Sequence, residues 1–160
     1  MTALFKHHFQ ICYLVDDAGQ GMAAFGEAYG ITRWHVIDMV AMMGAQSPLR
    51  TIALAWAGDT MIELAEPIET VPSIYSNWRR DSGLAARFHH LGFLAQSEQD
   101  YAEIKGQLAA AGFPVVVENT VEDVLSAAQI DTTAALGHYY ELIHLAGGME
   151  NPFFAPVPRN

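Results

Sequence analysis

The chain has 160 residues, of which 51% are hydrophobic and 16% are charged. This length and this apolar content allow a packed core and exclude a disordered chain. The formal net charge of −10 excludes a nucleic-acid surface, which requires clustered Lys and Arg, and it also argues against binding to an anionic membrane.

The first half of the sequence predicts a strand, a helix and then three strands. Apolar side chains at helical spacing mark the helix, and Gly30 follows them as a stop signal. Gly58 and Asp59 form a tight-turn signal between the last two strands. We therefore expect a helix at 19–29 and strands at 9–15, 31–40, 49–57 and 60–65.

The second half repeats this order. Tyr101, Ile104 and Leu108 lie on one face of a predicted helix at 97–111, and Gly112 follows as its stop signal. Each half thus predicts β-α-β-β-β, and the whole chain predicts an α+β fold of two tandem modules. The strands of this half are expected at 88–94, 113–117, 127–132 and 138–145.

The length fits one domain that spans 1–160. The linker between the modules is marked by Pro, Ser and Gly, and the C-terminal tail contains three prolines. We expect the tail to wrap the surface of this subunit or of a neighbouring one. The predicted parts are module one at about 7–66, the linker at 67–87, module two at about 88–146 and the tail at 147–160.

A His at the start of one predicted strand and a Glu on a later strand occur once in each half. His8 precedes Glu63 in the first half, and His90 precedes Glu141 in the second. Two imidazoles and two carboxylates are the ligands that one divalent metal ion needs, and they suit Zn, Ni, Co, Mn or Fe alike. The repeat therefore suggests one metal site, and Glu63 and Glu141 are also the best candidates for catalytic acid and base.

Other side chains are expected to share a pocket with these residues, because side chains alternate across a strand. Core packing is the alternative interpretation for Cys12, Trp34 and Tyr139. The implied pocket is apolar and aromatic, and it suits a small-molecule substrate. The predicted substrate-binding residues are Gln10, Cys12, Trp34, Met61 and Tyr139.

Three features of the sequence indicate the cellular compartment of the protein. Cys12 is the single cysteine, which excludes an intrachain disulfide and fits a reducing compartment. No run of about 18 apolar residues predicts a membrane span. The polar residues Lys6, His7 and His8 come too early for a secretory leader. We therefore expect a cytoplasmic protein.

Three strings, taken with their order and spacing, resemble a known group of proteins. Residues 29–34 (Tyr-Gly-Ile-Thr-Arg-Trp) are similar to its Gly-Ile-Gly-Pro-Trp segment. Residues 61–67, followed by Ser-Ile-Tyr at 73–75, are similar to its Glu-Leu-x-x-Pro and Ser-x-Tyr segments. Residues 88–93 are similar to its His-His-x-x-Phe string. The sequence thus resembles the vicinal oxygen chelate superfamily, in its glyoxalase-like branch.

This resemblance implies that the two modules form a curved, cup-shaped mixed sheet around one divalent metal ion. The ligand positions of the superfamily match His8, Glu63, His90 and Glu141. The implied function is that of a metal-dependent lyase or isomerase. Such an enzyme transfers a proton next to a carbonyl or enediolate of a small, partly apolar substrate. A homodimer is also expected.

Departures from the patterns of the superfamily leave other functions open. Cys12 and Pro67 stand where lactoylglutathione lyases carry Arg and Asn, which argues against glutathione. Methylmalonyl-CoA epimerases have Gln where this chain has Glu63, and they use another Glu on the middle strands, whereas residues 38–47 contain none. Four candidate ligands fit an extradiol dioxygenase poorly. The alternatives are an acyl-CoA epimerase and a non-catalytic sequestering or resistance protein.

Overall fold

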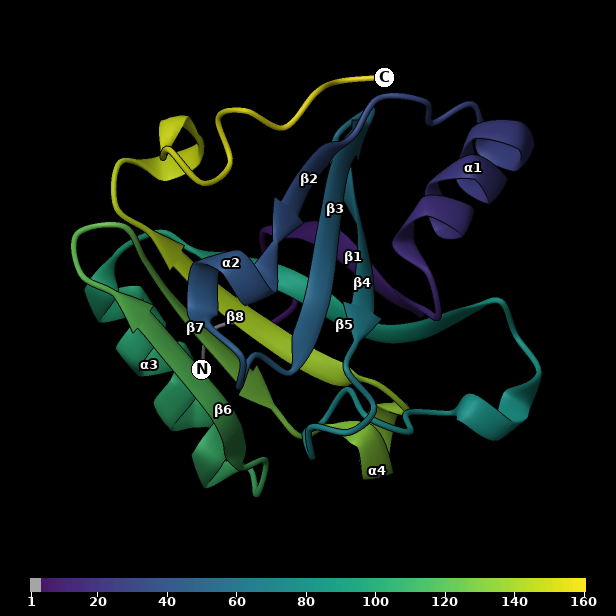
Figure 1. Cartoon of the computed structure of the whole chain (residues 1–160). Helices are drawn as coiled ribbons and strands as arrows, with labels where there is room; N and C mark the ends of the chain where they lie inside the picture. Colours follow the sequence, from purple (N-terminus) through teal and green to yellow (C-terminus); the bar gives the residue numbers. More distant parts are fainter. Residues whose placement is uncertain (1–3) are drawn as a thin grey trace. The chain divides into compact units, whose positions relative to one another are not determined.

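The computed structural model describes residues 4–160, and it confirms the mixed α+β fold with two β-α-β-β-β modules (Figure 1). The elements of the first module are β1 (His8–Val15), α1 (Ala18–Tyr29), β2 (His35–Asp38), α2 (Met39–Met43), β3 (Leu49–Ala57) and β4 (Thr60–Pro67). Those of the second are β5 (Ala86–Ala95), α3 (Glu98–Ala110), β6 (Val115–Val121), β7 (Leu125–Ile130), α4 (Thr133–Leu136) and β8 (Tyr139–Leu145). Two short 3-10 turns, η1 (Arg80–Ser82) and η2 (Gly148–Glu150), complete the chain.

Two short helices were not expected from the sequence. The strand predicted at 31–40 is only four residues long, because the Asp38 side chain accepts a hydrogen bond from the Ala41 backbone N–H at 2.9 Å and starts α2. In the second module α4 precedes β8, and Gly137 ends it with a φ of 78°. Capping by Asp38 has thus replaced the end of a predicted strand in the first module, whereas α4 fills the interval between two predicted strands in the second.

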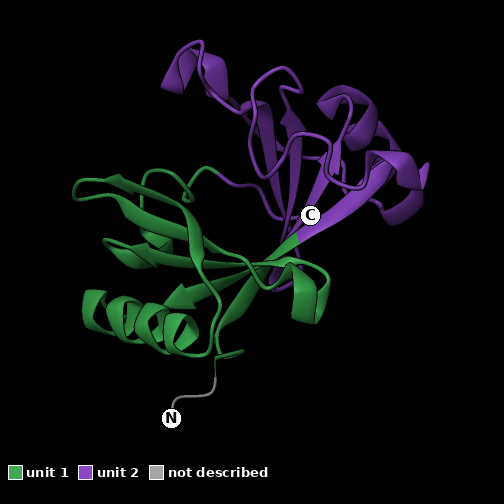
Figure 2. Ribbon diagram, turned by 90° about the horizontal axis from the view of Figure 1, so that it is seen from below, with its two compact units in different colours: residues 1–10, 90–156 green, residues 11–89, 157–160 purple. Residues whose placement is uncertain are grey.

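The chain forms two compact units, drawn in different colours in Figure 2. Of the described residues, unit 1 contains 4–10 and His90–Pro156, and unit 2 contains Ile11–His89 and Val157–Asn160. The strand order is β2-β3-β4-β1-β5-β8-β7-β6. Strands β2, β3 and β4 lie in unit 2, strands β6, β7 and β8 lie in unit 1, and β1 and β5 each run through both.

In unit 1, helix α3 covers one face of the strands. Tyr101, Ile104 and Leu108 of α3 are buried against side chains of β5, β7 and β8. Phe93 and Tyr140 stack there, with ring centroids 4.1 Å apart and ring planes 9° apart. Since side chains alternate along a strand, the residues between these core positions point to the face that α3 leaves open.

In unit 2, helix α1 covers the corresponding face. Asp17 caps the helix by accepting a hydrogen bond from the Gln20 backbone N–H at 2.7 Å. Met22 and Phe25 of α1 pack on a core that includes Val15 and Leu64. The opposite face of these strands carries a second apolar cluster, made by Cys12, Leu14, Met39, Leu49 and Ala65.

The last residues described, Val157–Asn160, pack on unit 2. The Trp56 backbone N–H donates to the Pro158 carbonyl at 2.9 Å, and the Asn160 backbone N–H donates to the Trp56 carbonyl at 2.9 Å. The Asn160 side-chain oxygen accepts from the backbone N–H groups of Thr32 and Arg33, at 3.0 and 2.9 Å. This segment therefore extends the hydrogen bonding of β3 beyond the end of β2.

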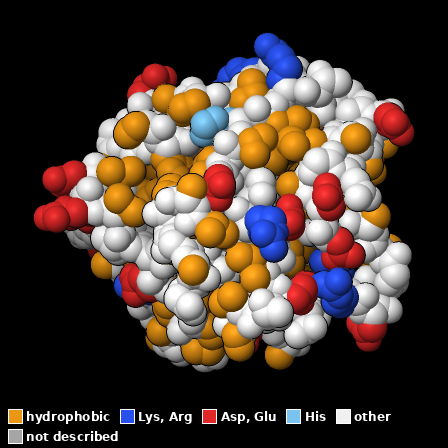
Figure 3. All heavy atoms as spheres, viewed as in Figure 1, with side chains coloured by type: hydrophobic (Ala, Val, Ile, Leu, Met, Phe, Trp, Pro, Cys, Tyr) orange, Lys and Arg blue, Asp and Glu red, His pale blue; other side chains and the backbone are white. Residues whose placement is uncertain are grey.

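Charge is dispersed over the visible surface. On the face drawn in Figure 3, Lys and Arg side chains lie singly or in small groups among acidic and apolar ones. None of the helices formed by residues 4–160 has the length and apolar character that crossing a lipid bilayer requires.

Candidate active site

The open face of unit 1 carries a buried imidazole beside a carboxylate. Strands β5 and β8 run parallel, with Gly92 opposite Glu141 and His90 opposite Tyr139. His90 Nε2 lies 3.1 Å from Glu141 Oε2, and the exposed fractions of the two side chains are 2% and 14%. The structure therefore brings together the two residues that the sequence predicts as metal ligands in the second module.

Gln129 holds the other oxygen of this carboxylate. It lies directly opposite Glu141 in the antiparallel pair β7 and β8, and its Nε2 donates to Glu141 Oε1 at 2.7 Å. Gln129 is only 3% exposed. The sequence analysis did not single out this residue, although an amide inside an otherwise small and apolar strand was the available signal.

A second amide lies on the same face at β1. Gln10 is 1% exposed and lies against Gly92 of β5. A β-carbon at Gly92 would be 2.7 Å from Gln10 Oε1 and 2.9 Å from Gln10 Cβ, so only glycine leaves space for this side chain. The neighbouring strands β1, β8 and β7 thus present Gln10, Glu141 and Gln129 on one face. Gly92 of β5 lies between Gln10 and Glu141 and leaves space for the Gln10 side chain.

The structure places His8 differently from Gln10. His8 is exposed, and its Nε2 lies 2.9 Å from the Gln10 backbone carbonyl on its own strand. The two helix caps, Asp17 and Ser97, provide an internal alignment of the modules. Counted back from these caps, Gln10 and not His8 matches His90. His8 stays a predicted ligand, and Gln10 is a second candidate for the same role.

Tyr139 lies beside His90 across the β5 and β8 pair. The side chain is 9% exposed, and burial, followed by the charge of Asp131, raises the pKa of its phenol. The hydroxyl is therefore neutral at physiological pH and can donate or accept a hydrogen bond. Contact of Tyr139 with substrate stays a prediction.

In unit 2 the predicted ligand Glu63 lies on β4, opposite Leu54 of β3. It is 7% exposed and lies between Met61 and Ala65 on the face that α1 does not cover. Burial of a carboxylate is costly unless a cation or hydrogen bonds compensate for it. Unit 2 thus has a buried carboxylate on its open face, where unit 1 has the partly buried carboxylate of Glu141.

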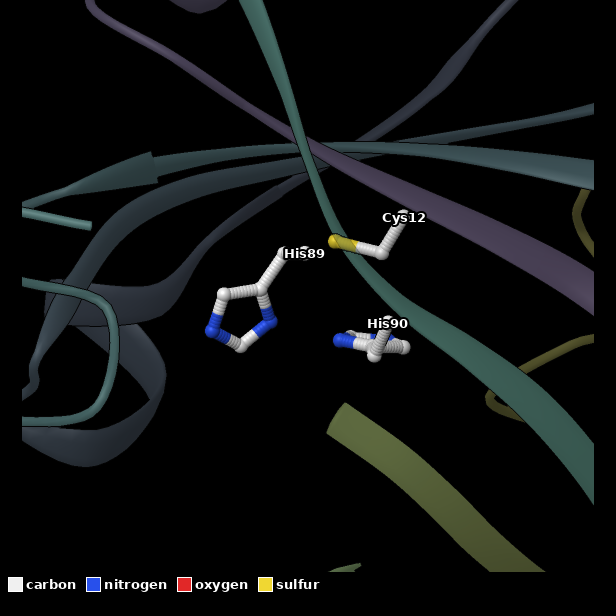
Figure 4. A group of neighbouring side chains, drawn as sticks. All are labelled: Cys12, His89 and His90. Atoms are coloured by element: carbon white, nitrogen blue, oxygen red, sulfur yellow. The ribbon is translucent and has the colours of Figure 1, made fainter. Parts of the chain in front are cut away.

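The same face of unit 2 carries a thiol beside an imidazole. Figure 4 shows Cys12 of β1 and His89 of β5, and the sulfur lies within 4.8 Å of a ring nitrogen of His89. His89 Nε2 lies 3.2 Å from the Ile74 carbonyl, and Tyr75 stacks on the ring at 4.9 Å. The linker therefore fixes His89 from one side.

Trp34, which was predicted to contact substrate, lies on the other face of unit 2. Its ring meets Phe25 of α1 at a centroid distance of 6.2 Å, and its Nε1 donates to the Ile31 carbonyl at 3.0 Å. These contacts belong to the core beneath α1. They support the alternative interpretation of Trp34 as a core residue.

The donor set is compatible with a divalent metal ion. His90 and Glu141 supply nitrogen and oxygen atoms within one buried cluster, and Glu63 supplies a further buried carboxylate. Imidazole and carboxylate are ligands for Zn, Ni, Co, Mn and Fe. The Gln129 amide orients the Glu141 carboxylate, as outer hydrogen bonds do in metal sites. The residues present therefore fit the cofactor that the sequence predicts.

Comparisons with known proteins identify the fold. No protein-family model matches the chain, and no curated protein matches its sequence. A methylmalonyl-CoA epimerase from Mycobacterium tuberculosis is 15% identical, with a TM-score of 0.60 over 91% of this chain and 92% of that one. A Streptomyces coelicolor epimerase variant in complex with 2-nitronate-propionyl-CoA is 16% identical, with a TM-score of 0.64 over 88% and 94%.

A third solved structure, of a methylmalonyl-CoA epimerase in complex with methylmalonyl-CoA and NH4+, is 18% identical. Its TM-score is 0.62 over 91% of this chain and 98% of that chain. Identities this low establish a shared fold and leave the substrate open. The chain therefore shares the fold of these epimerases over most of its length.

Proposed function

We propose that this protein is a metal-dependent isomerase that moves a proton at the carbon next to the carbonyl of an acyl thioester. The observation that carries this proposal is the contact between the buried His90 and the partly buried Glu141 on the open face of unit 1. The fold shared with epimerases of acyl-CoA substrates adds support. Among enzymes of this fold, we favour an acyl-CoA epimerase over a glyoxalase-like lyase.

Under this proposal His90, Glu141 and Glu63 hold the metal ion, with His8 or Gln10 as the remaining ligand. When bound, the ion supplies a Lewis acid that polarises the carbonyl oxygen of the substrate. Glu141, when it is not bound to the ion, would remove the proton from the carbon through Oε2, because a carboxylate beside the reacting atom can act as general base. Gln129 keeps one oxygen of Glu141 fixed while the other oxygen reacts.

Inversion at carbon requires a second group that returns a proton to the opposite face. We assign this role to Glu63, which would have to be released from the ion and carry a proton when it acts as the acid. Residues 38–47 contain no Glu, and the one carboxylate among them, Asp38, already caps α2. Glu63 is a buried carboxylate on the open face of unit 2. We therefore propose that one carboxylate from each module serves the reaction.

The substrate is proposed to lack glutathione. Cys12 and Pro67 occupy the positions where lactoylglutathione lyases carry Arg and Asn. Cys12 is fully buried in an apolar cluster, so no cation stands at the position of that Arg to hold a glutathione carboxylate.

The test is hydrogen exchange at the carbon next to the thioester carbonyl. The purified protein is reloaded separately with Zn, Ni, Co, Mn and Fe, and metal content is measured by mass spectrometry. Methylmalonyl-CoA and 2-hydroxypropionyl-CoA are then incubated in D2O, and deuterium at carbon 2 is followed by NMR. We expect metal-dependent deuterium uptake that Glu141→Gln abolishes. Absence of uptake with all five metals would contradict the proposal and favour a sequestering protein.

We also propose that the chain forms a homodimer. Val36 on β2 and Met42 and Met43 on α2 are about half exposed, and β2 lies at one end of the strand order. Exposed apolar side chains beside an end strand favour association. Light scattering should give twice the 17.5 kDa chain mass, and the monomer mass at micromolar concentration would refute the proposal.

A further inference from the structure

The amide of Gln129 has a defined orientation. The amide presents its Nε2 to Glu141, because Nε2 is its donor and the hydrogen bond to Oε1 is 2.7 Å long. Its Oε1 therefore points away from that carboxylate. This oxygen is buried and accepts no hydrogen bond from any of residues 4–160.

A buried amide oxygen that accepts no hydrogen bond from the protein can accept one from a ligand. Burying a carbonyl oxygen without a partner is unfavourable, and a ligand that brings an O–H or N–H recovers the missing hydrogen bond. A ligand carboxylate brings only acceptors, and it would meet both this oxygen and the charge of Glu141. The site should therefore discriminate between these two kinds of substituent.

We infer that Gln129 is a specificity-determining residue that selects an acyl thioester with a hydroxyl group on the carbon next to the carbonyl. This inference rests on the proposed function. Gln129 and Glu141 lie directly opposite each other on β7 and β8, so a donor at Gln129 Oε1 is close to the carboxylate that moves the proton. The donor consequently sits on the reacting carbon or next to it. A 2-hydroxyacyl thioester meets this requirement, whereas a malonyl thioester presents a carboxylate there.

The test compares the binding of two probes that differ by one oxygen atom. Calorimetry measures the affinity of metal-loaded protein for 2-hydroxypropionyl-CoA and for propionyl-CoA. We expect the wild type to prefer the hydroxylated probe about tenfold, the size of one neutral hydrogen bond. Gln129→Met, which keeps the length of the side chain but removes its polar atoms, should bind both probes equally well.

The control substitutes another glutamine that donates to a glutamate. Gln99 Nε2 donates to Glu103 Oε1 at 2.8 Å on the exposed surface of α3. Gln99→Met should keep the tenfold preference. Methylmalonyl-CoA serves as a third probe of the wild type alone, so the inference stays testable even if Gln129→Met fails to fold. Binding of methylmalonyl-CoA as tight as that of 2-hydroxypropionyl-CoA would overturn it.

Deuterium exchange on the same samples separates this inference from the proposed function. A hydroxyl preference that depends on Gln129, without exchange at carbon 2, would refute the isomerase and leave the recognition role standing. Exchange without a hydroxyl preference would support the isomerase and overturn the role of Gln129. Failure of the wild type to bind either probe at millimolar concentration would also overturn it.

Discussion

The two open faces of this protein are built on the same frame but carry different chemistry. In unit 1 the face left uncovered by α3 is polar, with His90, Glu141 and Gln129 linked by contacts of 3.1 and 2.7 Å. In unit 2 the face left uncovered by α1 is apolar, apart from Glu63 and the pair of Cys12 and His89. The repeated strands and helices thus place a carboxylate on the open face of each unit. The side chains around each carboxylate determine its chemical role.

The largest effect should come from replacing the two carboxylates in turn. Glu141→Gln should reduce proton exchange by a factor of about 10² to 10⁴, because the general base is lost while the fold is kept. Glu63→Gln should allow deuterium to enter from one face and prevent inversion. NMR and chiral analysis of the same reaction measure the two outcomes. Equal loss of both activities in both variants would show that the carboxylates have no separate roles.

The identity of the first ligand can be decided with a matched pair of variants. Gln10→Ala and His8→Ala remove neighbouring side chains of β1, one buried and one exposed. If Gln10 matches His90 in function, Gln10→Ala should weaken metal affinity by more than the factor of about 10 to 100 that loss of an outer partner of a ligand costs, whereas His8→Ala should leave it unchanged. Metal titration with a competing chelator measures both. The opposite result would establish His8 as the ligand.

The close approach of Gln10 to Gly92 predicts that a larger residue at position 92 destabilises unit 1. Gly92→Ala would place a β-carbon 2.7 Å from Gln10 Oε1, and such overpacking costs about 1–3 kcal/mol. Gly106 of α3 is the control, since a β-carbon there meets nothing within 4 Å. Gly106→Ala should stabilise the protein by about 0.5–1 kcal/mol. Urea unfolding compares the two, and similar values would mean that Gln10 moves aside easily.

The smallest effect concerns alkaline pH. Burial raises the pKa values of Tyr101, Tyr139 and Tyr140, all of which lie in unit 1. A phenol whose pKa is higher in the folded state remains neutral while the unfolded chain ionises above a pKa of about 10. Stability should therefore be intact below that pH and should fall as the pH rises through it. Tyrosinate absorbance during alkaline unfolding, compared with Tyr101→Phe, measures this loss, and an unchanged profile would contradict it.

The sequence predicts the frame of the protein well because the frame depends on local patterns. Helical spacing and turn residues identified α1, α3 and the order of strands, and the His-Glu repeat with the family resemblance assigned Glu141 and His90 to one site. It could not identify Gln129, because the contact with Glu141 depends on the register between β7 and β8. Nor could it choose between His8 and Gln10. Both lie on the same side of β1 by parity. They differ in burial, because His8 is the exposed first residue of the strand and Gln10 is buried two residues further on.

The placement of Val157–Asn160 in unit 2 has a consequence for synthesis on the ribosome. Most of unit 2 emerges early, but the hydrogen bonds from this segment to Trp56, Thr32 and Arg33 cannot form until residue 160 has left the exit tunnel. Unit 1 likewise combines 4–10 with residues made much later. Unit 1 therefore cannot complete its folding before residue 156 has emerged, and unit 2 cannot before residue 160 has emerged.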